Sequence, residues 1–332
     1  MLPNKKSSIL LVLKVLEEYT DEEHYLTQQE IADKIDQIFE IQLERKSLGA
    51  YLSMLEELDY DIAKGPKGGF ALLSRTFDQT EASFLIDAVF SSRSIDGRQA
   101  KKISDQVSGC FSRYQRRDYY YSYIYKSSEI NRTINKQVLY NISVIHEAMK
   151  RGKRVGFQYL AYDEEGNQTT RREGYEYIVS PYYLVNNFGR YYLLCNYREK
   201  YRALQTFRLD FMMNITIKED WPIKKMADLK DGPKDFSISK YINDHIYLFG
   251  GDMVDALLEL DGDWAIVIVK DWFGENAKIS HKDKKIYVDV RCNEIALYYW
   301  IMQYSDCVKV ISPVSLIDKV KEGLTNALKR YE

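Results

Sequence analysis

Residues 180–210 constrain the fold of this chain more than any other part of its sequence. Two runs of alternating aromatic and aliphatic residues flank Asn186-Asn187-Phe188-Gly189, a tetrapeptide rich in residues that tolerate the positive φ angles of tight turns. The second run, residues 190–197, has the composition that a half-buried pleated surface favours. The stretch therefore predicts a β-hairpin, followed by a third run that ends in an arginine among apolar neighbours.

Three short motifs follow one another through this stretch: Ser180-Pro181-Tyr182, Tyr191-Tyr192-Leu193 and Arg208-Leu209-Asp210. In this order they resemble the WYL domain of bacterial transcriptional regulators. Tyr191 stands in the place of the tryptophan, and Phe211 replaces the second arginine of the element usually written Arg-Leu-Asp-Arg. The resemblance implies a small Sm-like β-barrel that senses an anionic effector, which is nucleic acid (single-stranded nucleic acid included), a nucleotide or another phosphate-bearing molecule.

The resemblance also implies that the effector contacts the aromatic and basic residues of these strands. The candidate effector-binding residues are Ser180, Tyr182, Arg190, Tyr191, Tyr192, Arg198, Arg208 and Asp210. Tyr192 and Leu193 are adjacent and face opposite sides of a sheet, so at least one of them belongs to the core. Arg208 and Asp210 share a strand face, so Arg208 either touches the ligand or pairs internally with Asp210. Arg190, Arg198 and Arg202 are the cations that could compensate for the arginine lost at Phe211.

Residues 1–75 show the order helix, helix, helix, hairpin. Apolar residues recur at helical spacing in residues 6–19 and 44–58, and Thr27-Gln28-Gln29-Glu30 forms a capping box that opens the middle helix. Residues 62–73 are a glycine-rich basic hairpin. This pattern is typical of a winged helix-turn-helix that binds duplex DNA, and a helical bundle with an appended hairpin is the alternative.

The candidate DNA-binding residues lie at the start of the second and third helices and on the hairpin. They are Gln28, Gln29, Arg45, Lys46, Ser47, Tyr51, Lys64 and Lys67. Residues 1–75 carry nine Lys/Arg against fourteen Asp/Glu, a balance of −5 that is unusual for a DNA-binding module. The acidic residues concentrate at 17–23 and 56–61, away from these candidates in sequence.

Residues 76–136 read as a helical connector, with Thr80 capping one helix and residues 96–114 forming an amphipathic stretch. Residues 92–136 carry ten Lys/Arg against four Asp/Glu, a balance of +6. Arg113, Arg116 and Arg117 precede a tyrosine-rich run, an interleaving that could bind single-stranded nucleic acid. We favour the alternative, an extended arm with alternating buried tyrosines that packs one domain or subunit onto another.

The remaining chain divides into two α+β parts. Residues 137–223 are the WYL part, with a helix at 135–150 and strands at 154–162, 175–185, 190–197 and 203–217. After a linker at 224–240, residues 241–332 predict a ferredoxin-like domain. Its expected elements are strands at 257–268, 285–292 and 308–312 and helices at 270–275, 295–304 and 313–331, the last with Leu316, Val320, Leu324 and Leu328 facing inward. The whole is a multidomain α+β protein.

What the sequence lacks argues against several protein classes. No run of eighteen uncharged apolar residues predicts a membrane helix, and Lys14 interrupts the apolar N-terminal stretch where a signal peptide would need continuity. The four cysteines lie far apart without a CxxC pair, which indicates reduced cytoplasmic thiols and no metal site. No nucleophile, metalloprotease or phosphate-loop motif is present, so we expect neither enzymatic activity nor a cofactor.

These features predict a cytoplasmic, homodimeric transcriptional regulator with duplex DNA and an anionic effector as its partners. The effector would shift the two winged helices and so change operator affinity. The alternative is a nucleic-acid-binding accessory protein that regulates an enzyme partner through its WYL domain, with a winged helix that does not bind DNA. The acidic balance of residues 1–75 favours this alternative.

Overall fold

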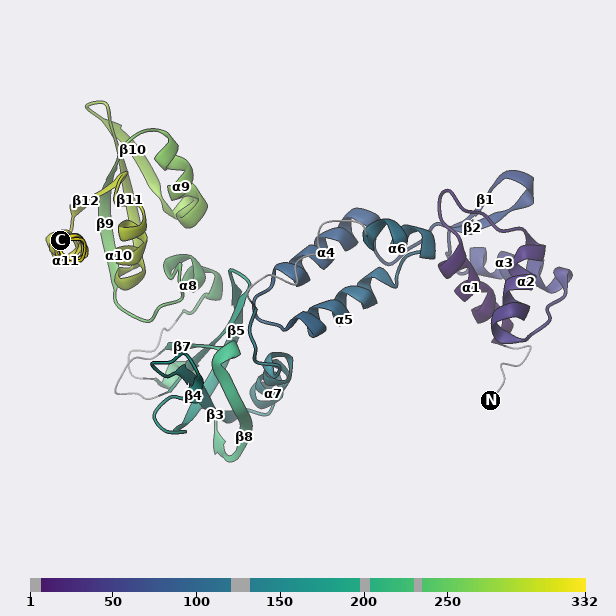
Figure 1. The fold of residues 1–332 in the computed structure, drawn as a ribbon, viewed down its shortest axis with the longest axis horizontal. Helices are drawn as coiled ribbons and strands as arrows, with labels where there is room; N and C mark the ends of the chain where they lie inside the picture. The colour runs from purple at the N-terminus through teal and green to yellow at the C-terminus, as the bar shows by residue number, and fades with distance from the viewer. Residues whose placement is uncertain (1–6, 121–131, 198–203, 230–234) are drawn as a thin grey trace. The chain divides into compact units, whose positions relative to one another are not determined.

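The computed structural model describes residues 7–120, 132–197, 204–229 and 235–332 (Figure 1). The chain divides into two compact units, residues 1–134 and 135–332. Helices and three antiparallel sheets give the mixed α+β composition that the sequence predicts. None of the helices among the described residues is long and apolar enough to cross a membrane.

The first unit begins with three helices and a short hairpin, followed by three further helices. Its elements are α1 (Ser8–Tyr19), α2 (Gln28–Phe39), α3 (Arg45–Glu57), β1 (Ile62–Lys64), β2 (Phe70–Leu72), α4 (Gln79–Ser91), α5 (Gly97–Ser108) and α6 (Arg113–Tyr120). The capping box predicted at Thr27 is confirmed, because the Thr27 hydroxyl accepts from the Glu30 amide and the Glu30 carboxylate accepts from the Thr27 amide. The apolar faces of α1, α2 and α3 share one buried cluster with β1 and β2.

The hairpin between β1 and β2 is tied to the loop before α2. Leu26 exchanges two backbone hydrogen bonds with Phe70. A Cβ atom at Gly65 would lie 2.2 Å from the ring of Tyr25, which explains why this position lacks a side chain. Gly65 is therefore required for close packing, since its φ of −103° is one that other residues also adopt.

Two expectations for the connector are wrong. The cap of α4 is Asp78, whose carboxylate accepts from the Glu81 amide, and Thr80 lies inside the helix. The amphipathic stretch divides into α5 and α6, because the Ser112 hydroxyl accepts from two amides and starts a new helix. The predicted extended arm is therefore helical through Tyr120, and the tyrosine-rich residues after it lie outside the described part of the chain.

The second unit begins with a helix and a six-stranded antiparallel sheet. Its elements are α7 (Val138–Lys150), β3 (Lys153–Tyr162), β4 (Gln168–Thr170), β5 (Glu176–Asn187), β6 (Arg190–Asn196), β7 (Gln205–Arg208), the one-turn 3-10 helix η4 (Leu209–Phe211) and β8 (Met212–Pro222). The order is β4-β3-β5-β6-β7, and β8 returns to pair with β3, so the last strand meets the first. Helix α7 packs on the apolar face of these strands.

The strand predicted at residues 203–217 is interrupted by η4. The buried amide of Asn135 donates to the backbone carbonyls of Asp210 (3.1 Å) and Met212 (2.8 Å). The buried amide of Asn141 donates to the same Met212 carbonyl at 2.9 Å. These bonds satisfy carbonyls that leave the sheet ladder at η4, and they explain why α7 begins at Val138 rather than at Asn135.

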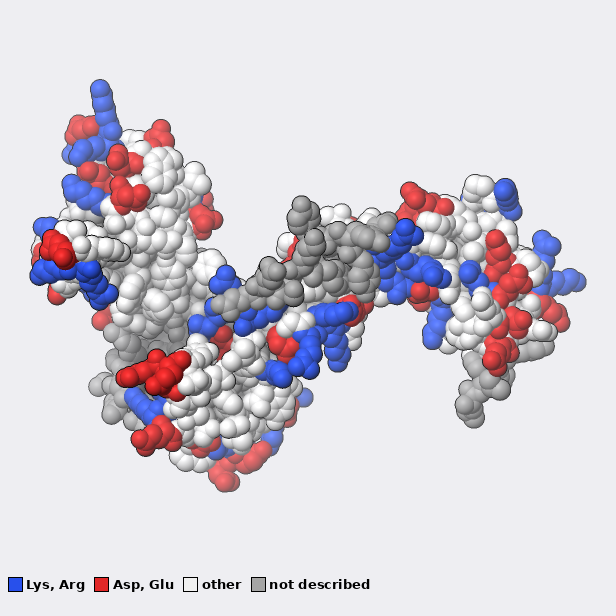
Figure 2. Space-filling view, in the orientation of Figure 1, with Lys and Arg blue, Asp and Glu red and all other residues white. Residues whose placement is uncertain are grey.

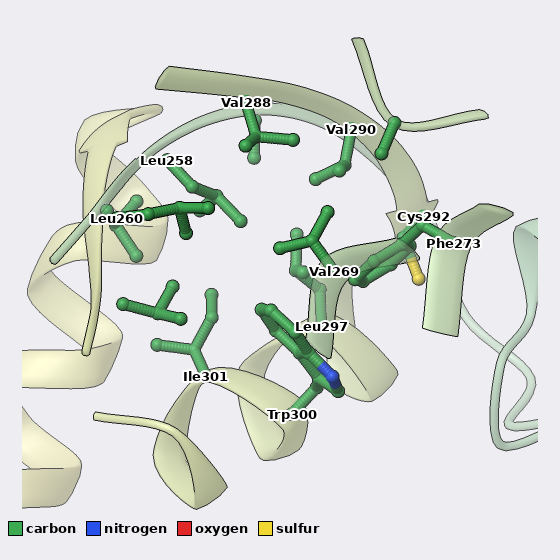
Figure 3. Packing of buried hydrophobic residues seen from close by; sticks show 14 of the residues in the cluster. Leu258, Leu260, Val269, Phe273, Val288, Val290, Cys292, Leu297, Trp300 and Ile301 are labelled. Atoms are coloured by element: carbon green, nitrogen blue, oxygen red, sulfur yellow. The ribbon is translucent and has the colours of Figure 1, made fainter. Parts of the chain in front are cut away.

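The remainder of the second unit forms a separate sheet with its own core. Its elements are α8 (Ile238–Asp244), β9 (Met253–Leu260), α9 (Trp264–Phe273), β10 (Lys278–Lys282), β11 (Lys285–Asn293), α10 (Glu294–Gln303), β12 (Val308–Ser312) and α11 (Val314–Leu328). The antiparallel order is β10-β11-β9-β12, and α9 and α10 place Val269, Leu297 and Trp300 against Leu258 and Val288 (Figure 3). Helix α8 begins within the stretch predicted as a linker.

Three expectations for this region are wrong. The strand predicted at residues 257–268 ends at Leu260, and the rest belongs to α9, where Ala265, Val269 and Phe273 face the core four residues apart. Strand β10 has no counterpart among the predicted elements. Leu324 and Leu328 are exposed, whereas Leu316 and Val320 of the same helix are buried.

Candidate functional site

Two arginines share one carboxylate where β7 ends. Arg208 binds Asp210 with two hydrogen bonds, from Nε to Oδ1 at 3.1 Å and from Nη2 to Oδ2 at 2.6 Å. Arg190, from the neighbouring strand β6, adds a third bond from Nη1 to Oδ2 at 3.2 Å. The internal pairing of Arg208 with Asp210, one of the two readings of the sequence, is therefore present, and Arg190 joins it across the sheet.

Two aromatic residues complete the setting of Arg208. Its guanidinium carbon lies 4.3 Å from the ring centre of Phe211, a cation–π arrangement at the position where the family pattern has a second arginine. Its backbone amide donates to the hydroxyl of Tyr159 on β3 at 3.1 Å. Phe211 thus packs against the guanidinium of Arg208 and restricts its orientation, instead of supplying a second charge.

The charges of this cluster sum to +1. The side chain of Asp210 is 5% exposed, whereas those of Arg190 and Arg208 are 29% and 28% exposed, so the carboxylate lies beneath the two cations. Burial alone would lower the pKa of Arg208, but its hydrogen bonds to Asp210 outweigh burial and raise that pKa. Burial raises the pKa of Tyr159 to about 12, so its phenol stays neutral and keeps its proton.

A surface pocket of about 560 Å³ opens beside this cluster, and Arg208 is the member of the cluster that lines it. Its lining residues from the β3–β8 sheet are Tyr159, Tyr192, Thr206 and Arg208, and those from the following region are Tyr247, Leu248, Phe249, Gly250, Ile295 and Tyr299. Tyr192 is paired with Arg208 in the sheet, and burial raises the pKa of its phenol. Arg208 is the charged residue of this lining, and a guanidinium pairs with the oxygens of a carboxylate or phosphate.

The sequence did not indicate most of these lining residues. Tyr159 could have been found, because it alternates with the buried Phe157 on an aromatic strand. The segment from Tyr247 to Gly250 carries no local pattern that links it to residues forty positions earlier. Its place at the pocket is set by tertiary contacts alone.

The other predicted effector-binding residues lie elsewhere. The Ser180 hydroxyl accepts from the Lys224 amide at 3.1 Å and the Tyr182 hydroxyl donates to the Lys224 carbonyl at 2.7 Å, so both fasten the chain that leaves β8. Tyr191 packs against the core under α7, on the opposite face from Tyr192. Arg198 and Arg202 lie outside the described residues. The structure therefore brings together Arg190, Tyr192, Arg208 and Asp210.

The predicted DNA-binding residues lie at the starts of α2 and α3 and on the hairpin. Arg45, Lys46, Lys64 and Lys67 are exposed. Arg45 also donates from Nε to the side-chain oxygen of Gln28 at 3.3 Å, which links the first turns of the two helices. Gln29 is exposed and donates to Asp33 at 2.8 Å, whereas Gln28, Ser47 and Tyr51 are partly buried.

The arginine cluster of the connector contacts the acidic end of α1. Arg116 forms an ion pair with Glu18, and Gln115 donates to the carboxylate of Glu22 at 2.9 Å. Arg113 lies 5.2 Å from the ring centre of Tyr19. Lys and Arg side chains gather over α5 and α6 in Figure 2. Some of the acidic residues in 1–75 thus bind side chains of α6.

Asp21 is the most buried member of this contact. Its carboxylate accepts from the hydroxyl of Ser112 and from the ring and amide nitrogens of His24, whose ring stacks on Tyr114 at 3.8 Å. Burial alone would raise the pKa of Asp21, but these hydrogen bonds outweigh it and lower that pKa. Within residues 7–120, then, α6 is fixed to the turn between α1 and α2.

Metal ligands are not grouped in the described ranges, where no three His, Cys, Asp or Glu side chains could together hold an ion. The four cysteines are free, and burial raises the pKa of Cys195 and Cys292.

Comparisons with known proteins bear on the second unit. No curated protein matches the chain. Among solved structures, proteasome accessory factor B/C of Arthrobacter aurescens is 18% identical with a TM-score of 0.30, and the match covers 98% of this chain and 49% of that one, about half its length. A CRISPR Cas-related protein is 13% identical with a TM-score of 0.37, covering 98% of this chain and 84% of that one. Residues 140–217 match the WYL domain family model, so the predicted WYL domain is confirmed there, and it contains the Arg190–Asp210–Arg208 cluster.

Proposed function

We propose that this chain is a nucleic-acid-binding transcriptional regulator whose WYL domain binds an anionic ligand over Arg190 and Arg208. The observation that carries the proposal is the pair of half-buried arginines on one buried carboxylate, of which Arg208 lines a pocket with aromatic walls. In this proposal the three helices and hairpin of residues 1–75 are a winged helix-turn-helix that binds duplex DNA. The return of β8 to β3 supports an Sm-like barrel, and the order β10-β11-β9-β12 supports a ferredoxin-like C-terminal domain.

In this proposal Asp210 neutralises one of the two positive charges, and it also orients both guanidiniums for binding of the ligand. A guanidinium has five N–H donors in a fixed plane, and Asp210 accepts from two of those of Arg208. Asp210 accepts two of these donors along one edge of the guanidinium, which also lies over the ring of Phe211, and the remaining donors match the oxygens of a phosphate or carboxylate. Little side-chain entropy is lost on binding, because the arginine is already ordered.

Replacing Arg208 by alanine tests this site. We expect Arg208→Ala to remain folded at reduced stability, because Asp210 keeps its bond from Arg190, and to weaken anion binding by at least about tenfold, since a charge-assisted hydrogen bond contributes about 1.5–3 kcal/mol. Titration calorimetry with a nucleoside monophosphate measures the affinity, and circular dichroism checks the fold. Arg291→Ala removes an exposed arginine that pairs with Asp255 on the other sheet and serves as the matched control. An unfolded Arg208→Ala, or one with unchanged affinity, contradicts the assignment.

The DNA-binding part of the proposal rests on the exposed cations at the start of α3 and on the hairpin. Gel shifts against the DNA that flanks the gene test it with Arg45→Ala/Lys46→Ala. We expect sequence-selective binding to be lost, and the slope of log affinity against log salt to become shallower by about 1–2 as phosphate contacts disappear. Lys329→Ala/Arg330→Ala, two exposed cations after α11, is the control. Selective binding that survives the Arg45/Lys46 change rules out these residues.

The second candidate is an accessory protein that regulates an enzyme partner through its WYL domain. The observation that favours it is the −5 balance of residues 1–75, together with the engagement of Arg45 by Gln28. Absence of duplex binding in the same gel shifts, with anion binding intact, would favour this candidate. In either case we propose a cytoplasmic homodimer without enzymatic activity.

A further inference from the structure

Two residues with a backbone conformation that is unusual for their type lie where the WYL strands meet the C-terminal sheet, β10-β11-β9-β12. Phe188 has φ +48° in the turn between β5 and β6, and Leu248 has φ +53° in the segment between α8 and β9. This left-handed region raises the free energy of bulky side chains. Such conformations persist only where the surrounding structure holds them, and they are often associated with function.

Phe188 occupies a turn position that asparagine would fill at a lower cost in free energy. The ladder between β5 and β6 ends at the pair of Asn187 with Arg190, so Phe188 and Gly189, both with positive φ, form a two-residue turn. Turns of this kind favour Asn-Gly. The ring centre of Phe188 lies 5.2 Å from that of Trp272 on α9, and the side chain stays 68% exposed. Phenylalanine at this position therefore gives the turn a contact with the C-terminal sheet, and that contact is small.

The segment that contains Leu248 is bound to two WYL strands through its main chain. The Leu248 carbonyl accepts from the Thr206 hydroxyl of β7 at 2.6 Å, and the Ile246 carbonyl accepts from the Asn187 side-chain amide of β5 at 3.1 Å. The side chain of Leu248 is 1% exposed. Residues 246–248, which lead into β9, are thus attached at both ends.

The residues that make these attachments adjoin both arginines of the Arg190–Asp210–Arg208 cluster. Asn187 is the ladder partner of Arg190 across the hairpin. Thr206 precedes Arg208 by two residues on β7 and therefore shares its strand face. A displacement of either arginine thus reaches a residue that binds the segment leading to the C-terminal sheet.

We propose that residues 187–189 and Thr206 couple the arginine cluster to the C-terminal sheet. Their contacts attach the sheet through residues 246–248 and α9, and a change in the position of Arg190 or Arg208 loosens or tightens this attachment. The attachment itself requires no ligand, whereas its control by a ligand rests on the proposed anion site. Opening of the contacts releases Phe188 and Leu248 from unfavourable conformations, which reduces the free-energy difference between the attached and released arrangements.

Phe188→Asn tests the attachment without weakening the hairpin, because it creates the Asn-Gly pair that this turn favours. Hydrogen exchange of the full chain without ligand, followed by mass spectrometry, gives the rates. We expect the amides of residues 246–250 and of α9 to exchange about two- to tenfold faster, the range for loss of one aromatic pair, and those of β3 to be unchanged. Phe188→Tyr keeps the ring and the rates of the parent.

Thr206→Val tests the second attachment, since it removes the hydroxyl that binds the Leu248 carbonyl and keeps the shape of the side chain. We expect faster exchange at residues 246–250 here too. Thr216→Val, an exposed change on β8, is the matched control and leaves these rates unchanged. Parent rates at residues 246–250 in both Phe188→Asn and Thr206→Val overturn the coupling. Circular dichroism checks that each variant is folded.

Sodium phosphate added to the parent and to Phe188→Asn tests the control by a ligand. We expect phosphate to change the exchange rates of β6 and β7 in both proteins, and those of α9 in the parent alone. An equal effect on α9 in both proteins overturns the coupling and leaves the anion site in place. Unchanged rates at β6 and β7 contradict the anion site, and the comparison without ligand then decides the attachment by itself.

Discussion

Asp210→Asn is expected to destabilise the second unit and to tighten anion binding at the same time. The carboxylate accepts three hydrogen bonds from Arg190 and Arg208, and asparagine preserves its shape while removing its charge. Removing one partner of a buried ion pair costs about 3–5 kcal/mol, and because both guanidiniums keep more than a quarter of their exposure we expect about 3 kcal/mol. The cluster then carries +2 instead of +1, so an incoming anion replaces the missing counter-charge.

Urea unfolding with and without nucleoside monophosphate measures both effects. The variant should unfold at lower urea than the parent without ligand, and ligand should restore more stability to the variant than to the parent, since a ligand stabilises in proportion to RT ln(1 + [L]/Kd). Asp244→Asn, on α8, is the control for a lost carboxylate outside the cluster. If Asp210→Asn weakens anion binding, then Asp210 contacts the ligand or the arginines lose their orientation, and the proposed geometry is wrong.

Trp300→Ala is expected to be the most destabilising change in the C-terminal sheet. Trp300 is fully buried, and its ring packs edge-to-face on Phe273 with ring centres 4.9 Å apart (Figure 3). Truncating a buried tryptophan costs about 3–5 kcal/mol through lost contacts and the cavity left behind.

Trp300→Phe separates packing from hydrogen bonding at the same position. The indole N–H has no hydrogen-bond partner among the described residues, and an unpaired buried donor costs about 1–3 kcal/mol. Phenylalanine removes that donor and part of the volume, so the two effects oppose each other and the net change should be well below that of alanine. Guanidinium unfolding followed by circular dichroism gives both values. A cost for alanine below about 1 kcal/mol would mean that the core closes over the gap.

Local sequence patterns predicted the elements whose cause is local. The Thr27 capping box and the turn before Gly189 depend on neighbours within four residues, and both are present. The apolar run after Asp263 shows the opposite case. Its branched residues favour a strand, but packing of Ala265, Val269 and Phe273 on the sheet makes it a helix. Asp78 was missed as a cap because Thr80 offers the same chemistry two residues later.

The site was predictable only where two residues share a strand. Arg208 and Asp210 lie two apart, so their pairing was one of the two readings of the sequence. Arg190 reaches the same carboxylate across the β6–β7 ladder, which requires the register of Tyr192 with Arg208. Phe249 and Tyr299 lie still farther along the chain, Phe249 after a backbone turn that no local pattern marks and Tyr299 on α10. The separation of the site residues along the sequence, rather than their residue types, therefore limited how much of the site could be predicted.

Asn135 connects the Arg190–Asp210–Arg208 cluster to the chain that precedes the second unit. It is the first residue of the second unit, and its side-chain amide donates to the backbone carbonyl of Asp210. The side chain of Asp210 in turn accepts hydrogen bonds from both arginines. The chain therefore leaves the connector at a point anchored directly to η4. We expect a ligand that displaces Asp210 to move its backbone carbonyl, and with it the side chain of Asn135. The displacement would then be transmitted to the residue at which the chain continues back toward α1–α6.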